Sequence, residues 1–395
     1  MKRIGIITHY YKTINFGGAL QAYALSQMLN TKNFKAEQIS YVFRGTIQKL
    51  NETLFDRIRR NGIIGSIRII TTSVFSHISI KKLLVEKDQK KHNVVERRRQ
   101  AFAHFTEQII PHSEKAYTKE TISECVNDYE VFITGSDQVW NVQWYHKSFF
   151  LDFVPPEKTK ISYAASIARN SLTEKQQEIF RNSLKDYKAV SLREKSGVPL
   201  IEKLSPVQPI AVLDPTLLLS KGDWDDICAE RVVPQKYVFC YFLGDNKAER
   251  TIVQKFAKQK GLEIVTISYA SGNSASFNRK FGDIKLYDTT PEQFISLIKH
   301  AEYVFTDSFH AVVFSFIYQK QYFVFNRDKK ASMSSRIRDI TELFGTTERF
   351  CDGKERENLK YVLSLNDIDY SEENTEFEKL KAKSIDFLNR NLEQE

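Results

Sequence analysis

Residues 2–42 read KRIGIITHYYKTINFGGALQAYALSQMLNTKNFKAEQISYV and establish the fold class. The apolar run at Arg3–Thr8 predicts a buried strand, Gly18–Leu29 predicts a helix, and Ala36–Val42 predicts a second strand. A strand, a helix and a strand in this order form a parallel βαβ unit. The chain therefore opens as an α/β protein.

The same alternation of strands and helices continues to about residue 343. Strands are predicted at 129–134, 159–165, 189–192, 237–242, 263–267, 303–305 and 322–325. Helices are predicted at 173–184, 247–259, 291–300, 311–318 and 336–343. Because strands that alternate with helices form parallel sheets, we expect two Rossmann-like, doubly wound halves that face a cleft.

The proline distribution divides the two series. Four of the nine prolines lie between Pro199 and Pro215, which predicts a linker with one short strand. We therefore expect an N-terminal α/β domain at residues 1–205 and a C-terminal α/β domain at residues 206–345. Residues 346–395 are expected to form a tail with a charged amphipathic helix that packs back on the body.

The composition is that of a folded protein. Of the 395 residues, 42% are hydrophobic and 12% aromatic, which excludes disordered and low-complexity classes. The chain has no apolar run of about 18 residues, so we expect no membrane-spanning helix. The apolar run after Met1 is too short for a signal peptide, and we expect a cytoplasmic protein. The four cysteines lie far apart, which argues against a zinc site or a disulfide framework.

The formal charge of +9 is concentrated in one block. Residues 44–99 contain 14 Lys/Arg and 5 Asp/Glu residues, and a basic insertion at about 44–105 predicts two basic helices, at 54–74 and 81–105. Such helices can lie on an anionic membrane surface or meet an acidic partner, or they can form a solvated cover over the sheet. No nucleic-acid-binding motif accompanies them, so nucleic acid is not an expected partner.

The first polar loop of interest joins the first strand to the first helix. It contains Asn15, Gly17 and Gly18. Here backbone N–H groups can approach an anion at the positive end of a helix, or the glycines can simply permit a tight turn. The loop matches neither GxGxxG nor the P-loop, which disfavours dinucleotide binding and ATP hydrolysis.

The next two loops supply small polar side chains after predicted strands. Ser136, Asp137 and Gln138 follow the strand predicted at 129–134, and Ser166 follows the strand predicted at 159–165. Asp137 is the one carboxylate of its loop. It can act as an acid or a base, or it can cap the turn that follows.

Two further positions carry a cation or a titratable ring. Arg193 suits bidentate contact with a carboxylate or phosphate, or it can pair with Glu194 or Asp214. Ser308 and His310 stand where a buried strand enters an apolar helix, which offers an N-cap, exposed N–H donors and an imidazole. A lone histidine is more often structural.

Six blocks of sequence together resemble one known family. They are Asn15–Ala22 (NFGGALQA), Gly135–Asn141 (GSDQVWN), Tyr163–Ser166 (YAAS), Ser191–Glu194 (SLRE), Leu213–Thr216 (LDPT) and Thr306–His310 (TDSFH). With these blocks the chain resembles the polysaccharide pyruvyl transferase family from about Lys2 to Leu343, outside the basic insertion. The resemblance implies a fold like that of GT-B glycosyltransferases.

The resemblance also implies an activity and roles. A pyruvyl group would pass from phosphoenolpyruvate to a sugar of a surface polysaccharide or its lipid-linked precursor, forming a pyruvate ketal without a metal or a further cofactor. His310 would donate a proton, and Asp137 would accept one. The substrates would be held by Asn15, Gly17, Gly18, Ser136, Gln138, Ser166, Arg193, Ser308 and Arg336. The family commonly has an arginine at the position of Ser308, and Arg336 or Arg338 can supply that charge.

Two other functions stay open. A GT-B-type glycosyltransferase would use a nucleotide-sugar donor, but the nearest late carboxylates, Glu348 and Glu355, stand in a charged, loop-like stretch. A non-catalytic carbohydrate-binding subunit is the other, and Ser308 in place of an arginine favours it. The expected partners are phosphoenolpyruvate, a carbohydrate acceptor and, through the basic insertion, an anionic membrane surface.

Overall fold

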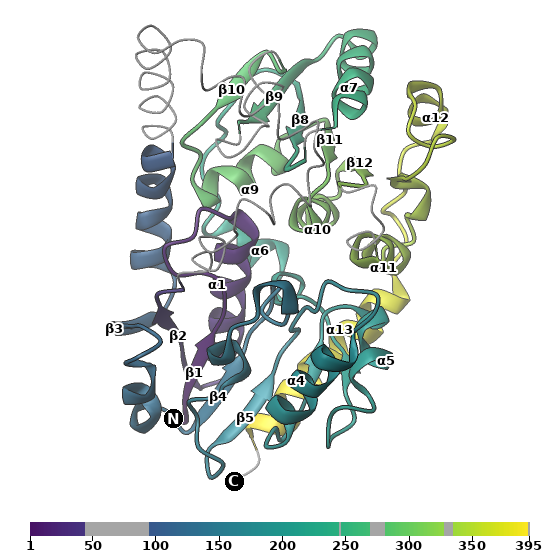
Figure 1. Cartoon of the computed structure of the whole chain (residues 1–395). Coiled ribbons are helices and arrows are strands. Elements are labelled where there is room, and N and C mark those ends of the chain that lie inside the picture. The colour runs from purple at the N-terminus through teal and green to yellow at the C-terminus, as the bar shows by residue number, and fades with distance from the viewer. Residues whose placement is uncertain (44–94, 245, 269–280, 328–334, 394–395) are drawn as a thin grey trace, which may run out of the picture.

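The computed structural model describes residues 1–43, 95–244, 246–268, 281–327 and 335–393. Two lobes lie one above the other in Figure 1, and each is built on a parallel β-sheet with helices beside it. The helix predicted at 54–74 and most of the helix predicted at 81–105 lie outside the described residues. The membrane contact of the basic insertion therefore stays a prediction.

The N-terminal lobe contains a five-stranded sheet in the order β3-β2-β1-β4-β5, in which every pair is parallel. Its strands are β1 (Arg3–Ile7), β2 (Lys35–Tyr41), β3 (His112–Tyr117), β4 (Val131–Thr134) and β5 (Thr159–Ser162). Ile4 pairs with Ala36 on one side and with Val131 on the other, so the strand order reverses beside β1. Ligands bind at such a switch point, outside the carboxyl ends of the strands.

The C-terminal lobe repeats this topology in the order β10-β9-β8-β11-β12-β13, again with parallel pairs. Its strands are β8 (Tyr237–Tyr241), β9 (Glu263–Ile267), β10 (Ile284–Leu286), β11 (Tyr303–Thr306), β12 (Gln321–Phe325) and β13 (Phe350–Cys351). The switch point lies between β8 and β11. The predicted pair of doubly wound halves is confirmed.

The helices begin where the sequence supplies a cap. Asn15, Thr173 and Thr290 each accept a hydrogen bond from an N–H group in the first turn of the helix that follows. The helices are α1 (Phe16–Asn30), α4 (Glu174–Leu184), α5 (Val198–Ile201), α6 (Lys221–Asp225), α7 (Lys247–Lys260), α9 (Pro291–Lys299), α10 (Phe309–Ile317), α11 (Ser335–Leu343), α12 (Leu359–Ser364) and α13 (Thr375–Leu392).

The proline-rich stretch between the lobes contains one short strand, as predicted. β7 (Ile210–Ala211) pairs in parallel with β6 (Ser191–Leu192), and the bridge between Ala165 and Leu192 joins this ribbon to the N-terminal lobe. The ribbon brings residues 193 and 214 to the carboxyl edge of the first sheet. The predicted domain boundary at residue 205 falls between α5 and β7, and it stays a prediction.

The C-terminal helix α13 returns to the N-terminal lobe, where Figure 1 shows it in yellow near α4 and α5. Ser384 Oγ accepts a hydrogen bond of 2.9 Å from the N–H group of Leu213, and Lys2 Nζ donates to the carbonyl of Leu392 at 2.7 Å. The side chain of Phe387 is buried close to Tyr163. The later part of α13 thus packs on the N-terminal lobe, while Phe377 near its start contacts Phe316 and Phe344 of the C-terminal lobe.

A continuous apolar core joins the two lobes. Phe16 of α1 stacks on Phe294 of α9 with ring centroids 4.5 Å apart, and it also contacts Phe102 in the helix at 95–104. From the same helix, the buried Arg98 donates hydrogen bonds to the carbonyls of Ser268 and Tyr287 in the C-terminal lobe. Because α1 is covered on nearly every side, its sequence is apolar all round rather than amphipathic.

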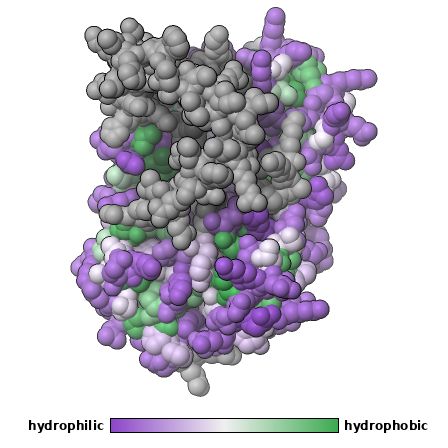
Figure 2. All heavy atoms as spheres, in the orientation of Figure 1, coloured by the Kyte–Doolittle hydropathy of each residue, from purple (hydrophilic) through white to green (hydrophobic). Residues whose placement is uncertain are grey.

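The described surface is polar. Most of the coloured surface in Figure 2 is hydrophilic, and its hydrophobic patches are small. Among the described residues, Met1 is the only large hydrophobic side chain that is exposed. None of the helices in this part of the chain is long and apolar enough to cross a bilayer.

Candidate functional site

Asp214 stands at the centre of a buried cluster between the two lobes. Its Oδ2 accepts hydrogen bonds from Ser136 Oγ at 2.8 Å and from Arg193 Nη1 at 3.1 Å. Its Oδ1 accepts from the N–H group and the hydroxyl of Thr216, at 3.1 and 2.7 Å. Nε2 of His310, from the other lobe, lies 3.6 Å from Oδ2. One carboxylate therefore connects the loop after β4, the end of β6 and the start of α10.

The electrostatics of this cluster keep Asp214 ionised. Burial alone would raise the pKa of its carboxyl, but His310 and Arg193, together with the hydrogen bond from Thr216, lower it well below the usual range. The side chain is fully buried, so the surrounding protein atoms supply all of this stabilisation. Asp214 thus places a negative charge beside the imidazole of His310.

His310 lies in the first turn of α10 and packs against the N-terminal lobe. A Cβ atom added to Gly17 would lie 2.0 Å from His310 Nδ1, so only glycine leaves room for the ring. Ser308 occupies the N-cap position of α10, but its side chain accepts no capping hydrogen bond, and its N–H group donates to Thr306 Oγ1. Both Ser308 and His310 are buried.

Protein atoms occupy the space beside Gly17 and Gly18, in the loop that joins β1 to α1. Asn15 Oδ1 accepts a hydrogen bond of 3.1 Å from the N–H group of Gly17 and caps α1. A Cβ atom at Gly18 would lie 2.6 Å from the carbonyl oxygen of His9. Gly17 and Gly18 therefore allow close approach of His310 and of the backbone at residue 9. An anion contact at this turn stays a prediction.

Asp137 has a left-handed backbone conformation, and its carboxylate is partly exposed. Its φ is 68°, a left-handed conformation that is held by hydrogen bonds from the N–H groups of Val139 and Ser166 to its carbonyl. The carboxylate lies 3.9 Å from Arg193 Nη1 and is 11% exposed. It makes no side-chain hydrogen bond to any residue that the structure describes. The neighbouring Gln138 side chain accepts from Asn141 at 3.0 Å.

Positive charge around Asp137 determines its ionisation. Burial would raise the pKa of the Asp137 carboxyl, but Arg193, His310, His9 and Arg336 together lower it below its ordinary value. Asp137 is therefore a carboxylate at neutral pH and can accept a proton or a hydrogen bond.

Arg193 is enclosed at the lobe interface. Its side chain is 2% exposed, and its guanidinium lies 4.4 Å above the ring of Phe309. Nη2 lies 3.8 Å from Glu194 Oε1, and Glu194 also accepts a hydrogen bond from Ser166 Oγ. Burial would lower the pKa of Arg193, but Glu194, Asp214 and Asp137 raise it. The pairing with Glu194 and Asp214 that the sequence left open is thus found.

Arg336 brings a further buried guanidinium into the cluster from the first turn of α11. Burial, together with the charges of Arg193 and Arg327, lowers its pKa to about 10, against the opposing charges of Glu194 and Asp137. Arg327 follows β12 and donates to the carbonyl of Asp307 at 3.0 Å. Three guanidiniums, Arg193, Arg327 and Arg336, therefore converge from both lobes.

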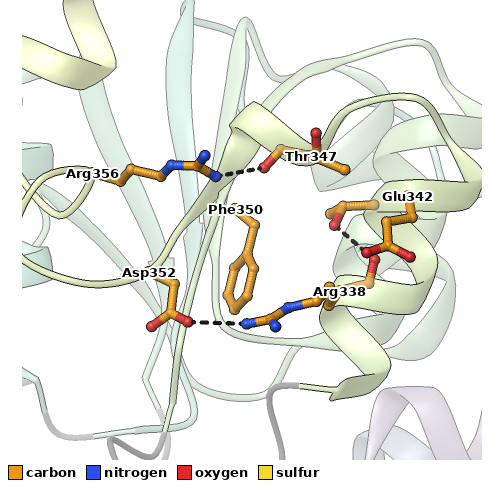
Figure 3. Close-up of a pocket in the computed structure, with 7 residues that line it drawn as sticks. Arg338, Glu342, Thr347, Phe350, Asp352 and Arg356 are labelled. Atoms are coloured by element: carbon orange, nitrogen blue, oxygen red, sulfur yellow. Dashed lines mark hydrogen bonds and ion pairs between the residues drawn. The ribbon is translucent and has the colours of Figure 1, made fainter. Parts of the chain in front are cut away.

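Arg338 lies elsewhere, at a cavity of about 330 Å³ that Figure 3 shows. The cavity is lined by Arg338, Thr341, Glu342, Thr347, Phe350, Asp352 and Arg356. Nη2 of Arg338 lies 3.6 Å from Asp352 Oδ2, and Arg356 donates to the carbonyl of Thr347 at 3.3 Å. Of the two arginines predicted to supply the missing charge, Arg336 alone joins the Asp214 cluster.

Three residues of the site were not predicted. Asp214 entered the sequence argument only as a partner of Arg193 and as part of the Leu213–Thr216 block, with no role of its own; in the structure it also caps the short turn η7 (Pro215–Leu217). Arg327 and His9 each follow the carboxyl end of a buried strand, and this position is the signal that could have identified them. In the part of the chain that the structure describes, no group of His, Cys, Asp or Glu side chains is arranged to hold a metal ion.

Two parallel α/β lobes with a charged cluster at the carboxyl ends of both sheets define a protein of the GT-B type. The family model for polysaccharide pyruvyl transferase matches residues 15–329, which include Asn15, Asp137 and His310. The chain belongs to this family, whose description is that of transferases acting on polysaccharide.

Solved structures support the fold. The chain is similar to a putative UDP-N-acetylglucosamine 2-epimerase from Listeria monocytogenes, with a TM-score of 0.53 and 9% identity, over 100% of this chain and 97% of that one. The enzyme from Methanocaldococcus jannaschii gives a TM-score of 0.53 and 9% identity, over 99% and 100%. UDP-GlcNAc 2-epimerase from Neisseria meningitidis, bound to UDP-GlcNAc, gives a TM-score of 0.51 and 8% identity, over 100% of both chains. At these identities the likeness concerns the fold alone. No curated protein matches the sequence.

Proposed function

We propose that the protein transfers the pyruvyl group of phosphoenolpyruvate to a sugar of a surface polysaccharide or its lipid-linked precursor, forming a pyruvate ketal. The observation that carries the proposal is that Arg193, Arg336 and His310 lie within electrostatic reach of Asp137, with Arg327 in turn within reach of Arg336. Phosphoenolpyruvate bears a carboxylate and a phosphate, so a site for it needs several cations in a place from which water is largely excluded. Arg336 is buried and belongs to the cluster from the C-terminal lobe.

The residues suit each proton transfer. His310 would donate a proton to the methylene carbon, and the adjacent carbon would then accept the oxygen of a sugar hydroxyl, whose proton would pass to Asp137. The carbon–oxygen bond to phosphate would break with its electron pair on the phosphate. A second hydroxyl would close the ketal, and its proton would leave with the phosphate. The carboxylate of Asp214, 3.6 Å from His310 Nε2, would stabilise the charged imidazole before transfer.

The experiment is to incubate the protein with phosphoenolpyruvate and a pool of bacterial surface oligosaccharides. We expect phosphate release that depends on saccharide, and mass spectrometry should find the added ketal. Arg336→Ala should slow the reaction about 10²- to 10³-fold, as loss of a buried charge-stabilising group does. Arg338→Ala is the matched control, because Arg338 belongs to the same helix but lies outside the cluster, and it should keep wild-type turnover.

Calorimetry separates the alternatives. Binding of a nucleotide sugar without binding of phosphoenolpyruvate would contradict the proposal in favour of a glycosyltransferase. Binding of saccharide with no consumption of either donor would instead indicate a non-catalytic subunit.

A further inference from the structure

Several rings pack on one another around His9, which lies within electrostatic reach of Asp137. They form an aromatic wall that consists of His9, Tyr41, Phe43, His146 and Phe149. His9 follows β1, while Tyr41 ends β2 and Phe43 comes two residues later, so the wall stands at the carboxyl edge of the N-terminal sheet. This is the edge at which Asp137 follows β4.

The rings of the wall are packed on one another. The centroids of His9 and Phe149 lie 4.2 Å apart, and the centroid of Phe43 lies 5.1 Å from each of them. His146 lies 5.2 Å from Phe43 and accepts or donates a hydrogen bond with the hydroxyl of Tyr41. Tyr41 and Phe149 are buried and form the base, whereas His9, Phe43 and His146 are half-buried. The outer layer thus keeps part of its surface free of protein atoms.

The wall carries polar atoms but little charge. Burial lowers the pKa of His9, against the opposing effects of Asp137 and the backbone of Gln138, and burial also lowers the pKa of His146. Both imidazoles are therefore largely neutral at pH 7, and each has one ring nitrogen in a hydrogen bond to protein, His146 with the Tyr41 hydroxyl and His9 with the backbone of Gln138, beside an uncharged ring face. A surface of this kind suits a neutral ligand with both apolar C–H faces and hydroxyl groups.

The wall is continuous with the proposed reaction site. His9 is close enough to Asp137 for each to shift the ionisation of the other. Arg193 Nη1 lies 3.9 Å from the Asp137 carboxylate, and Arg336 is also within electrostatic reach of it. The neighbours of this carboxylate therefore differ in chemistry: the arginines suit an anion, and the rings that begin at His9 suit a neutral polar ring.

We infer that the aromatic wall binds the saccharide acceptor, with a sugar ring against His9, Phe43 and His146 and a hydroxyl directed at Asp137. The inference rests on the proposed function, because it identifies the surface for the second substrate of the same site. The acceptor is assigned to the wall because of its charge. The anionic phosphoenolpyruvate gains more from the arginines than a neutral sugar does, whereas the C–H faces of a sugar ring can pack on neutral rings.

Saturation-transfer NMR with the methyl glycosides of glucose, galactose and mannose tests the wall without any turnover. We expect transfer to at least one of them in the wild-type protein, and Phe43→Ala should weaken that binding at least about 10-fold, as loss of a stacking partner does. Phe153→Ala is the matched control, because Phe153 is a half-buried phenyl of the same lobe that packs on Phe132, outside the wall. It should leave the binding unchanged.

The outcomes separate this inference from the proposed function. Equal saccharide affinity in Phe43→Ala and wild type, or no transfer to any of the three glycosides in the wild type, overturns the inference. The affinity for phosphoenolpyruvate, measured by calorimetry on the same samples, should be equal in Phe43→Ala and in the wild type. If the wild-type protein did not bind phosphoenolpyruvate, that result would contradict the proposed function. The NMR result would still decide whether the wall binds saccharide.

Discussion

Asp137 and Asp307 occupy equivalent places in the two lobes but differ in what their carboxylates contact. Asp137 stands three residues after β4, which pairs with β1, and Asp307 directly follows β11, which pairs with β8. Asp307 accepts hydrogen bonds from the N–H groups of Leu243 and Gly244 at 2.8 and 2.7 Å, and its side chain is fully buried. Asp137 makes no such bonds to described residues and remains 11% exposed.

The difference teaches that topology places a polar residue at the switch point, while local contacts decide its use. In the C-terminal lobe, the Asp307 carboxylate connects the loop after β8 to the end of β11 through hydrogen bonds, so its role is structural. In the N-terminal lobe, the backbone of Asp137 is fixed through its carbonyl, which leaves the carboxylate available to a substrate. Substitutions of the two aspartates should therefore separate activity from stability.

The largest effect is expected for Asp137→Asn. The amide keeps the shape of the side chain but cannot accept a proton, so ketal formation should fall about 10²- to 10⁴-fold. The free energy of unfolding should fall less than in Asp307→Asn, because the Asp137 side chain makes no hydrogen bond to described residues and loses only its charge, 3.9 Å from Arg193. Phosphate release and thermal unfolding measure the two quantities. Turnover close to that of the wild type would remove Asp137 from the mechanism.

Asp307→Asn should show the reverse pattern. Its amide can satisfy only one of the two N–H groups of Leu243 and Gly244, and Arg327 loses the charge 3.6 Å away. We expect the free energy of unfolding to fall by about 2 to 4 kcal/mol in urea titrations. The folded fraction should keep most of its activity. Asp288→Asn, at an exposed site of the same lobe, is the control and should unfold like the wild type.

Gly17→Ala tests the contact between Gly17 of the N-terminal lobe and His310 of the C-terminal lobe. The added methyl group would lie 2.0 Å from His310 Nδ1, so the ring or the lobes must move, at a cost of about 1 to 3 kcal/mol. Both the melting temperature and turnover should fall. Gly222→Ala is the control, because its methyl group meets only Ser220 Oγ at 3.6 Å in α6. Equal turnover in the two variants would show that His310 needs no fixed position.

The central strands could be predicted from sequence because they are continuous apolar runs. The predicted strand at 263–267 is β9 (Glu263–Ile267), and that at 303–305 differs from β11 by one residue. β3 reads HSEKAY, and β10 and β13 have three and two residues, so these edge strands carry no apolar run that could identify them. Their pairing depends on neighbours that are distant in sequence.

The site was predictable only where residue type and position after a strand agree. Asp137, Arg193 and His310 meet that condition, and the structure brings them together at Asp214. Asp214 itself could not be assigned, because its importance lies in contacts with residues 78 positions before it and 96 after it, both set by lobe packing. Their roles in catalysis stay predictions.

The smallest expected effect is on the pH dependence of stability, and it involves Glu249, a buried neighbour of Asp307. Glu249 in α7 accepts a hydrogen bond from Asn246 at 2.8 Å, but its Oε2 is buried without a hydrogen-bond partner among the described residues. Burial, with a further contribution from the charge of Asp307, raises the pKa of Glu249 to about 8. Between the unfolded value near 4.5 and this value, the folded state holds more protons, so its stability should fall as the pH rises.

Glu249→Gln should remove this part of the pH dependence. Urea titrations from pH 6 to pH 8 should show the wild type losing about 1 to 2 kcal/mol more stability than the variant, since each unit of pH corresponds to at most about 1.4 kcal/mol. Adding Asp307→Asn should reduce the difference, because the charge that disfavours ionised Glu249 is gone. The exposed Glu178→Gln is the control. Parallel pH curves for wild type and Glu249→Gln would mean that Glu249 is ionised in the folded protein and that Asp307 acts on the loop after β8 alone.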